Sequence, residues 1–174
     1  LPEDFYSSRY LVDRMIEFID SNLDDGKPFF AYVPFMAVHI PVQAPQEYID
    51  RYMGVYDTGW DALREQRRES AEALGIIPPG TAQVRMHSTG DWDALDSERK
   101  RYEAKRMAVY AAMIEAMDFH IGRLVNHLKA RGQYDNTLFI FTSDNGSEAS
   151  GPDNPQAFPS SLGPSRMGYH LDYD

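Results

Sequence analysis

The segment Leu138-Phe139-Ile140-Phe141-Thr142-Ser143-Asp144-Asn145-Gly146 joins an apolar run directly to a cluster of polar residues. Phe29-Phe30-Ala31-Tyr32-Val33 is a second apolar run, and Pro34 ends it. Aromatic and β-branched residues favour strands, and a strand without polar alternation is most simply one buried on both faces, as in a parallel sheet. The two runs therefore predict two strands of an α/β layer fold, joined by a right-handed crossover.

The rest of the chain shows helical spacing of apolar residues. Ser97 is the expected cap of the longest helix and Gly132 its stop. Two strands are too few for a complete sheet of this type, which indicates one segment of a larger domain. The predicted helices run from Ser7 or Ser8 to Gly26, from Pro45 to Tyr52, from Trp60 to Leu74, and from about Glu98 to Arg131.

The composition excludes several classes of protein. Lys and Arg total 17 against 27 Asp and Glu, a net charge of −10, which argues against a nucleic-acid binder and against adhesion to anionic membranes. The most apolar stretch, residues 29–38, is far shorter than the roughly 18 residues of a membrane span. The sequence has no cysteine, so this chain can supply neither a thiolate ligand nor a cysteine nucleophile. No compartment follows from these observations.

Both predicted strands lead into polar loops at their carboxyl ends, the edge of an open α/β sheet where ligands bind. Asp144 and Asn145 follow the second strand and offer the oxygen ligands that Ca²⁺ and Mg²⁺ prefer. The alternative for Asp144-Asn145-Gly146 is an ordinary tight turn. Two protein ligands cannot fill six or more coordination positions, so the other ligands would have to come from elsewhere.

His39 lies in the loop after the first strand and is the candidate catalytic residue. An imidazole there can act as a general acid or, when protonated, contact an anion. The alternative is a half-buried histidine bonded to a backbone carbonyl. His120 and His127 fall near the apolar stripe of the long helix, where packing or surface exposure is expected, and no role is assigned to His87 or His170.

An ordered set of motifs resembles the centre of type I sulfatases, particularly bacterial arylsulfatases. The set spans nearly the whole chain in the family's order, which makes it specific although no single motif is decisive. Its motifs are Lys27 to Phe35, Ala37-Val38-His39-Ile40-Pro41 through Pro45, Tyr56 to Arg64, Leu74 to Pro78, Val109 to Glu115, Met117-Asp118, Ile121 to Leu124, and Asp135 through Ser143-Asp144-Asn145-Gly146.

The resemblance implies a partial alkaline-phosphatase-like sheet with flanking helices and a sulfuric ester hydrolase that uses a formylglycine nucleophile and Ca²⁺, or Mg²⁺ in some members. By resemblance, Asp144 and Asn145 are half of the metal site, and His39 matches the histidine that contacts the sulfate. The substrate of the parent protein is then a sulfate ester. Residues 1–151 would be the central part of the catalytic domain, and 152–174 a loop-rich, partly disordered tail of that domain.

The chain also departs from the family pattern. It has no Cys-x-Pro-x-Arg or Ser-x-Pro-x-Arg motif for the nucleophile, and the early Asp pair of the metal site is missing. We therefore expect a fragment of an arylsulfatase that is inactive by itself. The alternatives are a binding or assembly module with a sulfatase-like fold, for which self-association is expected, and a phosphodiesterase or phosphonate hydrolase of the same superfamily.

Overall fold

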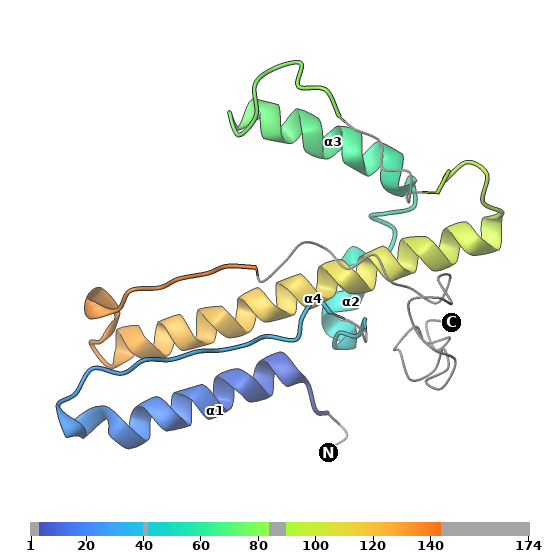
Figure 1. The fold of residues 1–174 in the computed structure, drawn as a ribbon. Coiled ribbons are helices and arrows are strands. Elements are labelled where there is room, and N and C mark those ends of the chain that lie inside the picture. The colour runs from blue at the N-terminus through green and yellow to red at the C-terminus, as the bar shows by residue number, and fades with distance from the viewer. Residues whose placement is uncertain (1–3, 40–41, 84–89, 144–174) are drawn as a thin grey trace, which may run out of the picture.

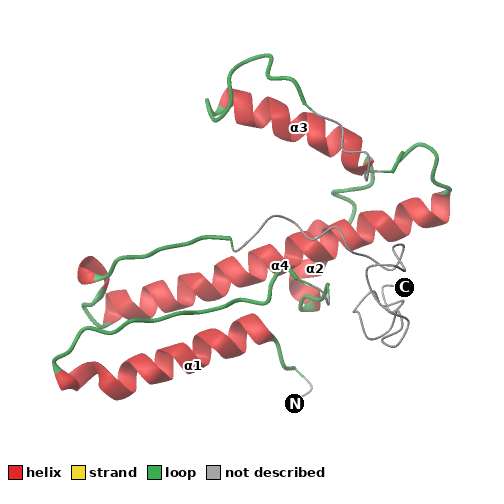
Figure 2. Ribbon diagram, viewed as in Figure 1, coloured by secondary structure: helices red, strands yellow, loops and turns green. Residues whose placement is uncertain are grey.

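The computed structural model of the chain describes residues 4–39, 42–83 and 90–143 (Figure 1). All regular elements in these ranges are helices, and none of them is both long enough and apolar enough to cross a membrane (Figure 2). The elements are α1 (Ser7–Asn22), η1 (Leu23–Asp25), α2 (Gln46–Tyr52), α3 (Gly59–Ala73), α4 (Ser97–Ala130) and η2 (Tyr134–Asn136).

The 34-residue helix α4 is the element against which the others pack. At 1.5 Å per residue it is about 50 Å long, and α1 and α2 lie along it (Figure 1). Its N-cap is Asp96, whose carboxylate accepts a hydrogen bond of 2.8 Å from the Arg99 amide. The predicted cap Ser97 is wrong by one residue, because the aspartate side chain satisfies the free amide of the first turn.

Four buried alanines at every fourth position of α4 form one side of the core: Ala104, Ala108, Ala112 and Ala116. Residues four apart share one face of a helix, and small side chains there let neighbouring elements approach closely. Tyr48 and Ile49 of α2 pack with Val109 and Met113 on one part of this face. Tyr56 and Trp92 pack with Ala104 and Ala108 on another part.

The base of α3 is held by two tryptophans, while the helix itself stands away from α4 (Figure 1). The rings of Trp60 and Trp92 meet edge to face at 4.8 Å, and Trp60 Nε1 donates a 2.9 Å hydrogen bond to the Gly90 carbonyl. Gly59 has φ +82°, and a Cβ there would lie 2.3 Å from the Trp92 ring. A larger residue at position 59 would therefore displace Trp92.

Polar contacts join α1 to the C-terminal half of α4. His127 Nε2 and Arg131 Nη2 each lie 2.9 Å from a carboxylate oxygen of Asp20, and Arg123 Nη2 lies 2.6 Å from Asp13 Oδ1. The hydrogen bond with His127, more than any other contact, lowers the pKa of Asp20, and Arg131 adds to the effect. Asp20 is thus a polar link between the two helices.

We expect Asp20→Asn to destabilise the protein at neutral pH and to have little effect in acid. A carboxylate whose pKa is lowered on folding stabilises the folded state at any pH above its ordinary pKa of about 3.9. This stabilisation is lost as the pH falls through the lowered pKa. Urea unfolding of both proteins over a pH series measures the difference. Asp24→Asn in the exposed η1 is the control; an effect of Asp20→Asn that does not change with pH would contradict the prediction.

The predicted helices agree with the structure to within a few residues at their ends. The predicted start of the first helix at Ser7 or Ser8 as cap is wrong. The N-cap position of α1 is Tyr6, which has extended backbone and makes no side-chain hydrogen bond to the helix. Ser8 instead lies inside α1 and is fully buried. Pro45, the predicted start of α2, occupies its N-cap position, one residue before the first helical residue, Gln46.

The two predicted strands are extended segments in the structure. They run beside α4 without ladder hydrogen bonds in the part of the chain that the structure describes (Figures 1 and 2). Their side chains are exposed, with Phe30 at 95%, Leu138 at 84% and Ile140 at 81%. The predicted helices are therefore confirmed, while the parallel sheet that they would flank stays a prediction.

Candidate functional site

His39 lies at the end of a tight turn that follows the first extended segment. Its backbone amide donates a 2.8 Å hydrogen bond to the Met36 carbonyl. Ala37 and Val38, within the turn, pack against the core cluster on α2 and α4, and the peptide bond between them is cis. His39 itself is exposed. The turn thus fixes the backbone of His39 to the core and leaves the imidazole accessible.

Asp144 and Asn145, the predicted metal ligands, lie outside the described residues, as does the segment 152–174. The second extended segment is described as far as Ser143, directly before them. Within residues 4–39, 42–83 and 90–143, no three His, Asp or Glu side chains converge in a way that could hold a metal. The chemistry of the pair, one carboxylate and one amide oxygen, fits a hard cation such as Ca²⁺.

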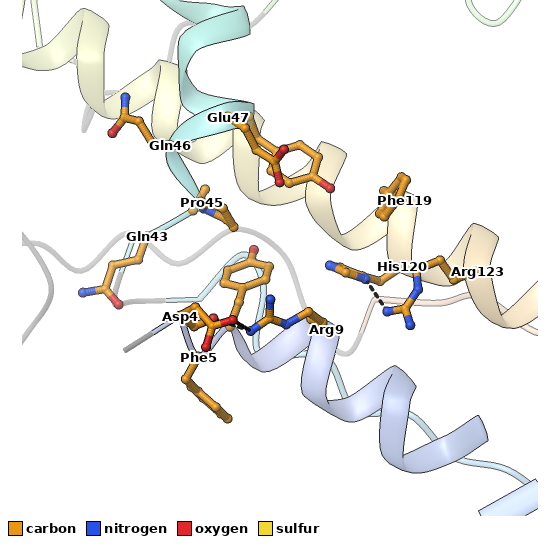
Figure 3. A pocket seen from close by; sticks show the side chains of 13 residues that line it. Asp4, Phe5, Arg9, Gln43, Pro45, Gln46, Glu47, Phe119, His120 and Arg123 are labelled. Carbon is orange, nitrogen blue, oxygen red and sulfur yellow. Dashed lines mark hydrogen bonds and ion pairs between the residues drawn. The ribbon is translucent and has the colours of Figure 1, made fainter. Parts of the chain in front are cut away.

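A cavity of about 870 Å³ lies between the start of α1, the start of α2 and the middle of α4 (Figure 3). Arg9 reaches it from α1, Glu47 from α2, and Phe119, His120 and Arg123 from α4. We call this cavity the three-helix pocket. These residues come from distant parts of the sequence and form no motif that points to a function.

The positive charges of the three-helix pocket are matched by carboxylates. Arg9 Nη2 lies 2.9 Å from Asp4 Oδ2 (Figure 3), and Arg123 is bound by Asp13. Glu47 contributes a further carboxylate to the lining. The pocket therefore carries no excess of positive charge that would attract a free anion.

His120 is 5% exposed. Burial, with a smaller contribution from Arg123, lowers its pKa, so the uncharged ring is favoured. Its Nδ1 lies 3.1 Å from Arg123 Nη1. Because arginine only donates, Nδ1 accepts and the proton of the neutral ring is on Nε2. The prediction of packing for His120 agrees with this burial.

Two tyrosines connect the three-helix pocket to the turn of His39. Tyr48 belongs to the core cluster on α2 and α4, and Tyr6 packs against that cluster, as do Ala37 and Val38. Burial raises the pKa of both tyrosines, with Glu47 adding to the effect at Tyr48. Both hydroxyls are therefore protonated at neutral pH, and the pocket and the His39 turn share one packed support.

Comparison with known proteins shows that the chain is similar to sulfatases. The family model described as Sulfatase matches residues 1–170. An uncharacterized sulfatase of Schizosaccharomyces pombe is 45% identical over 150 residues, covering 85% of this chain and 27% of the relative. An arylsulfatase of Klebsiella aerogenes is 42% identical over 146 residues, covering 84% of this chain and 31% of the relative.

A more distant relative is a multifunctional alkaline phosphatase superfamily protein of Trinickia caryophylli. It is 27% identical over 157 residues, which cover 85% of this chain and 29% of the relative. The chain thus spans less than a third of the length of each of these three proteins. Because the family model matches nearly the whole chain, the chain belongs to the sulfatase family.

Proposed function

We propose that this chain is the central part of the catalytic domain of an enzyme that hydrolyses sulfate esters of the arylsulfatase type. The observation that carries the proposal is the family match over residues 1–170. The 42% identity to a protein named arylsulfatase supports the aryl type. Residues 1–151 form the central segment, and 152–174 continue the same domain.

In this proposal His39 stabilises or protonates the leaving oxygen of the ester, and its exposure on a fixed turn supports that role. Asp144 and Asn145 supply two oxygen ligands to Ca²⁺ or Mg²⁺. When bound, such a cation acts as a Lewis acid and template for the sulfate group. The sequence holds neither a cysteine nor a Ser-x-Pro-x-Arg motif, so in this proposal another part of the full-length protein supplies the formylglycine nucleophile.

The test is turnover of 4-nitrophenyl sulfate by the full-length protein and by the 174-residue chain alone. We expect the full-length protein to release sulfate and the chain alone to be inactive. If the chain alone turned over the ester and the His39→Ala variant did not, the proposal that the nucleophile lies outside this chain would be contradicted. An inactive but well-folded full-length protein would instead favour the binding or assembly module.

A second candidate reaction is hydrolysis of phosphate diesters or phosphonates. The similarity to the multifunctional alkaline phosphatase superfamily protein of T. caryophylli favours it, at lower identity than the sulfatase relatives. Assaying bis(4-nitrophenyl) phosphate beside the aryl sulfate separates the two reactions. We expect the higher kcat/KM for the sulfate ester, and the reverse preference would assign the chain to the phosphodiesterase group.

We also propose that residues 29–33 and 138–142 become strands of a parallel sheet when the rest of the domain is present. The support is their exposed apolar side chains together with backbone groups that lack ladder partners among the described residues. Unpaired extended backbone is a ready template for another strand. In the chain alone the same surface would favour self-association.

Hydrogen exchange measures this sheet directly. We expect the amides of residues 29–33 and 138–142 to exchange quickly in the isolated chain and to be protected in the full-length protein. The amides in the middle of α4 are the internal control, because their helical hydrogen bonds exist in both forms. Fast exchange of the two segments in an active full-length protein would rule the sheet out.

A further inference from the structure

We propose that Val42 is a positioning residue for His39, because it anchors the chain that carries this histidine to the core on helix α4. The inference rests on the role that the proposed function gives to His39. Val42 would not touch the ester itself. It would act by fixing where the imidazole of His39 lies relative to the reacting group.

Val42 follows His39 in the sequence and, unlike it, is buried. It is 8% exposed and belongs to the core cluster of α2 and α4, together with Val109, Ala112 and Met113. These three residues of α4 are themselves buried, and α2 packs against the same helix (Figure 1). The surface on which Val42 packs is therefore part of the rigid core.

His39 lies between two anchored points of the backbone. On its N-terminal side, Ala37 and Val38 pack against the cluster, and the His39 amide bonds to the Met36 carbonyl. On its C-terminal side, Val42 follows after three Cα–Cα steps of about 3.8 Å each, so the two Cα atoms are at most about 11 Å apart. An exposed side chain on such a short span between buried anchors has little freedom to move away.

The residues after Val42 are weaker anchors or lie farther from His39. Ala44 packs against the cluster with a single methyl group. Tyr48 is buried in the cluster, but it comes nine residues after His39, in a helix that begins only at Gln46. The conformational freedom of a flexible segment increases with its length, so loss of the Val42 contact would leave His39 on a longer and looser span.

The position of the imidazole matters for either way in which it could assist the reaction. Protonation of a leaving oxygen and contact with a sulfate oxygen both require hydrogen-bond distance in the reacting complex. A misplacement of about 1 Å caused by a distant substitution can cost about 10²-fold in rate. Truncation of Val42 keeps the imidazole and loosens only its support, so we expect a smaller loss than in His39→Ala.

The test is a double-mutant cycle in the full-length protein, with kcat/KM for 4-nitrophenyl sulfate as the readout. We expect Val42→Ala to lower kcat/KM about tenfold when His39 is present. In the His39→Ala background the same substitution should change kcat/KM by no more than about twofold, because the group that Val42 positions has been removed. Val42→Ile keeps the branched apolar side chain and should retain activity within about threefold of the wild type.

Val12→Ala is the matched control, since it makes the same truncation at another buried position. Val12 is fully buried on α1 and does not belong to the cluster that holds Val42. Urea unfolding should show that Val12→Ala destabilises the protein at least as much as Val42→Ala. Its effect on kcat/KM should stay within about twofold, with or without His39.

Three results would overturn the positioning role: unchanged kcat/KM in Val42→Ala, the same fold-loss with and without His39, or an equal loss in Val12→Ala. If Val42→Ala does not fold, Val42→Thr is used in the same cycle, because it leaves no cavity but places a hydroxyl in the apolar cluster; an equal loss in both backgrounds is again contrary. The proposed function is judged separately by His39→Ala. Full activity of His39→Ala removes both roles, whereas a loss in His39→Ala without one in Val42→Ala removes only the role of Val42.

Discussion

Replacing His39 with alanine in the full-length protein is expected to lower kcat/KM for 4-nitrophenyl sulfate by about 10²-fold, the lower end of the usual contribution of a general acid–base group. The imidazole is the exposed polar group at the end of a turn whose amide bonds to the Met36 carbonyl. Removing the side chain leaves this backbone hydrogen bond intact. The loss should therefore appear in catalysis and not in folding.

Met36→Ala is the matched control for His39→Ala. Met36 lies in the same turn, is 58% exposed, and contributes a backbone carbonyl that the substitution retains. We expect this variant to keep nearly full activity and the same midpoint of urea unfolding. If both variants lose activity equally, the turn and not the imidazole is required, and His39 has no direct catalytic role.

A leaving group that is already acidic reduces the need for protonation, which gives a sharper form of the same experiment. The defect of His39→Ala should be smaller for 4-nitrophenyl sulfate than for an alkyl sulfate, whose alkoxide leaving group is far more basic. Equal defects for both esters would assign His39 to binding of the sulfate group. The comparison thus separates protonation from anion binding.

The helices could be predicted from the sequence because their signals are local. Helical spacing of apolar residues predicted the long helix, and of these residues Met113 and Leu128 are buried, whereas Tyr110 and Ile114 are 39% and 45% exposed. The caps were less predictable, since Asp96 competes with the neighbouring Ser97 for the same position and both are good caps. Propensity alone does not separate two adjacent candidates.

The strands show the opposite case. The apolar runs at residues 29–33 and 138–142 are extended, as predicted, but pairing depends on backbone partners that a local pattern cannot supply. Phe139 contacts the ring of Tyr134 at 5.5 Å, while Ile140 on the next position remains 81% exposed. A sheet is a non-local structure, so the pairing of these two segments stays a prediction.

The three-helix pocket could not be predicted because its residues form no motif. Arg9, Glu47 and Phe119 belong to three helices and meet only after α1 and α2 pack on α4. Each has an ordinary surface interpretation in the sequence. His39, in contrast, could be singled out from its place after a predicted strand, and Asp144 and Asn145 for the same reason.

Leu128→Ala is expected to lower the free energy of unfolding by about 2–5 kcal/mol, a large fraction of the roughly 5–15 kcal/mol that stabilises a typical domain. Leu128 is 2% exposed on α4, between His127 and Arg131, both of which bond to Asp20 of α1. Truncation would leave a cavity beside α4, and the bonds of the neighbouring His127 and Arg131 to Asp20 limit how far α4 can shift to close it. Urea unfolding of the wild type and the variant gives the difference.

Alanine substitutions at two further leucines test whether a residue exposed in this chain becomes buried in the full-length protein. Leu74 is 74% exposed after α3, and Leu74→Ala should change stability by no more than about 0.5 kcal/mol. Leu138 is 84% exposed here, so Leu138→Ala should be equally mild in the isolated chain. In the full-length protein it should cost as much as a core truncation, because the proposed sheet buries it. A mild Leu138→Ala effect in both forms would contradict the sheet, whereas a mild Leu128→Ala effect would contradict the burial of Leu128 on α4.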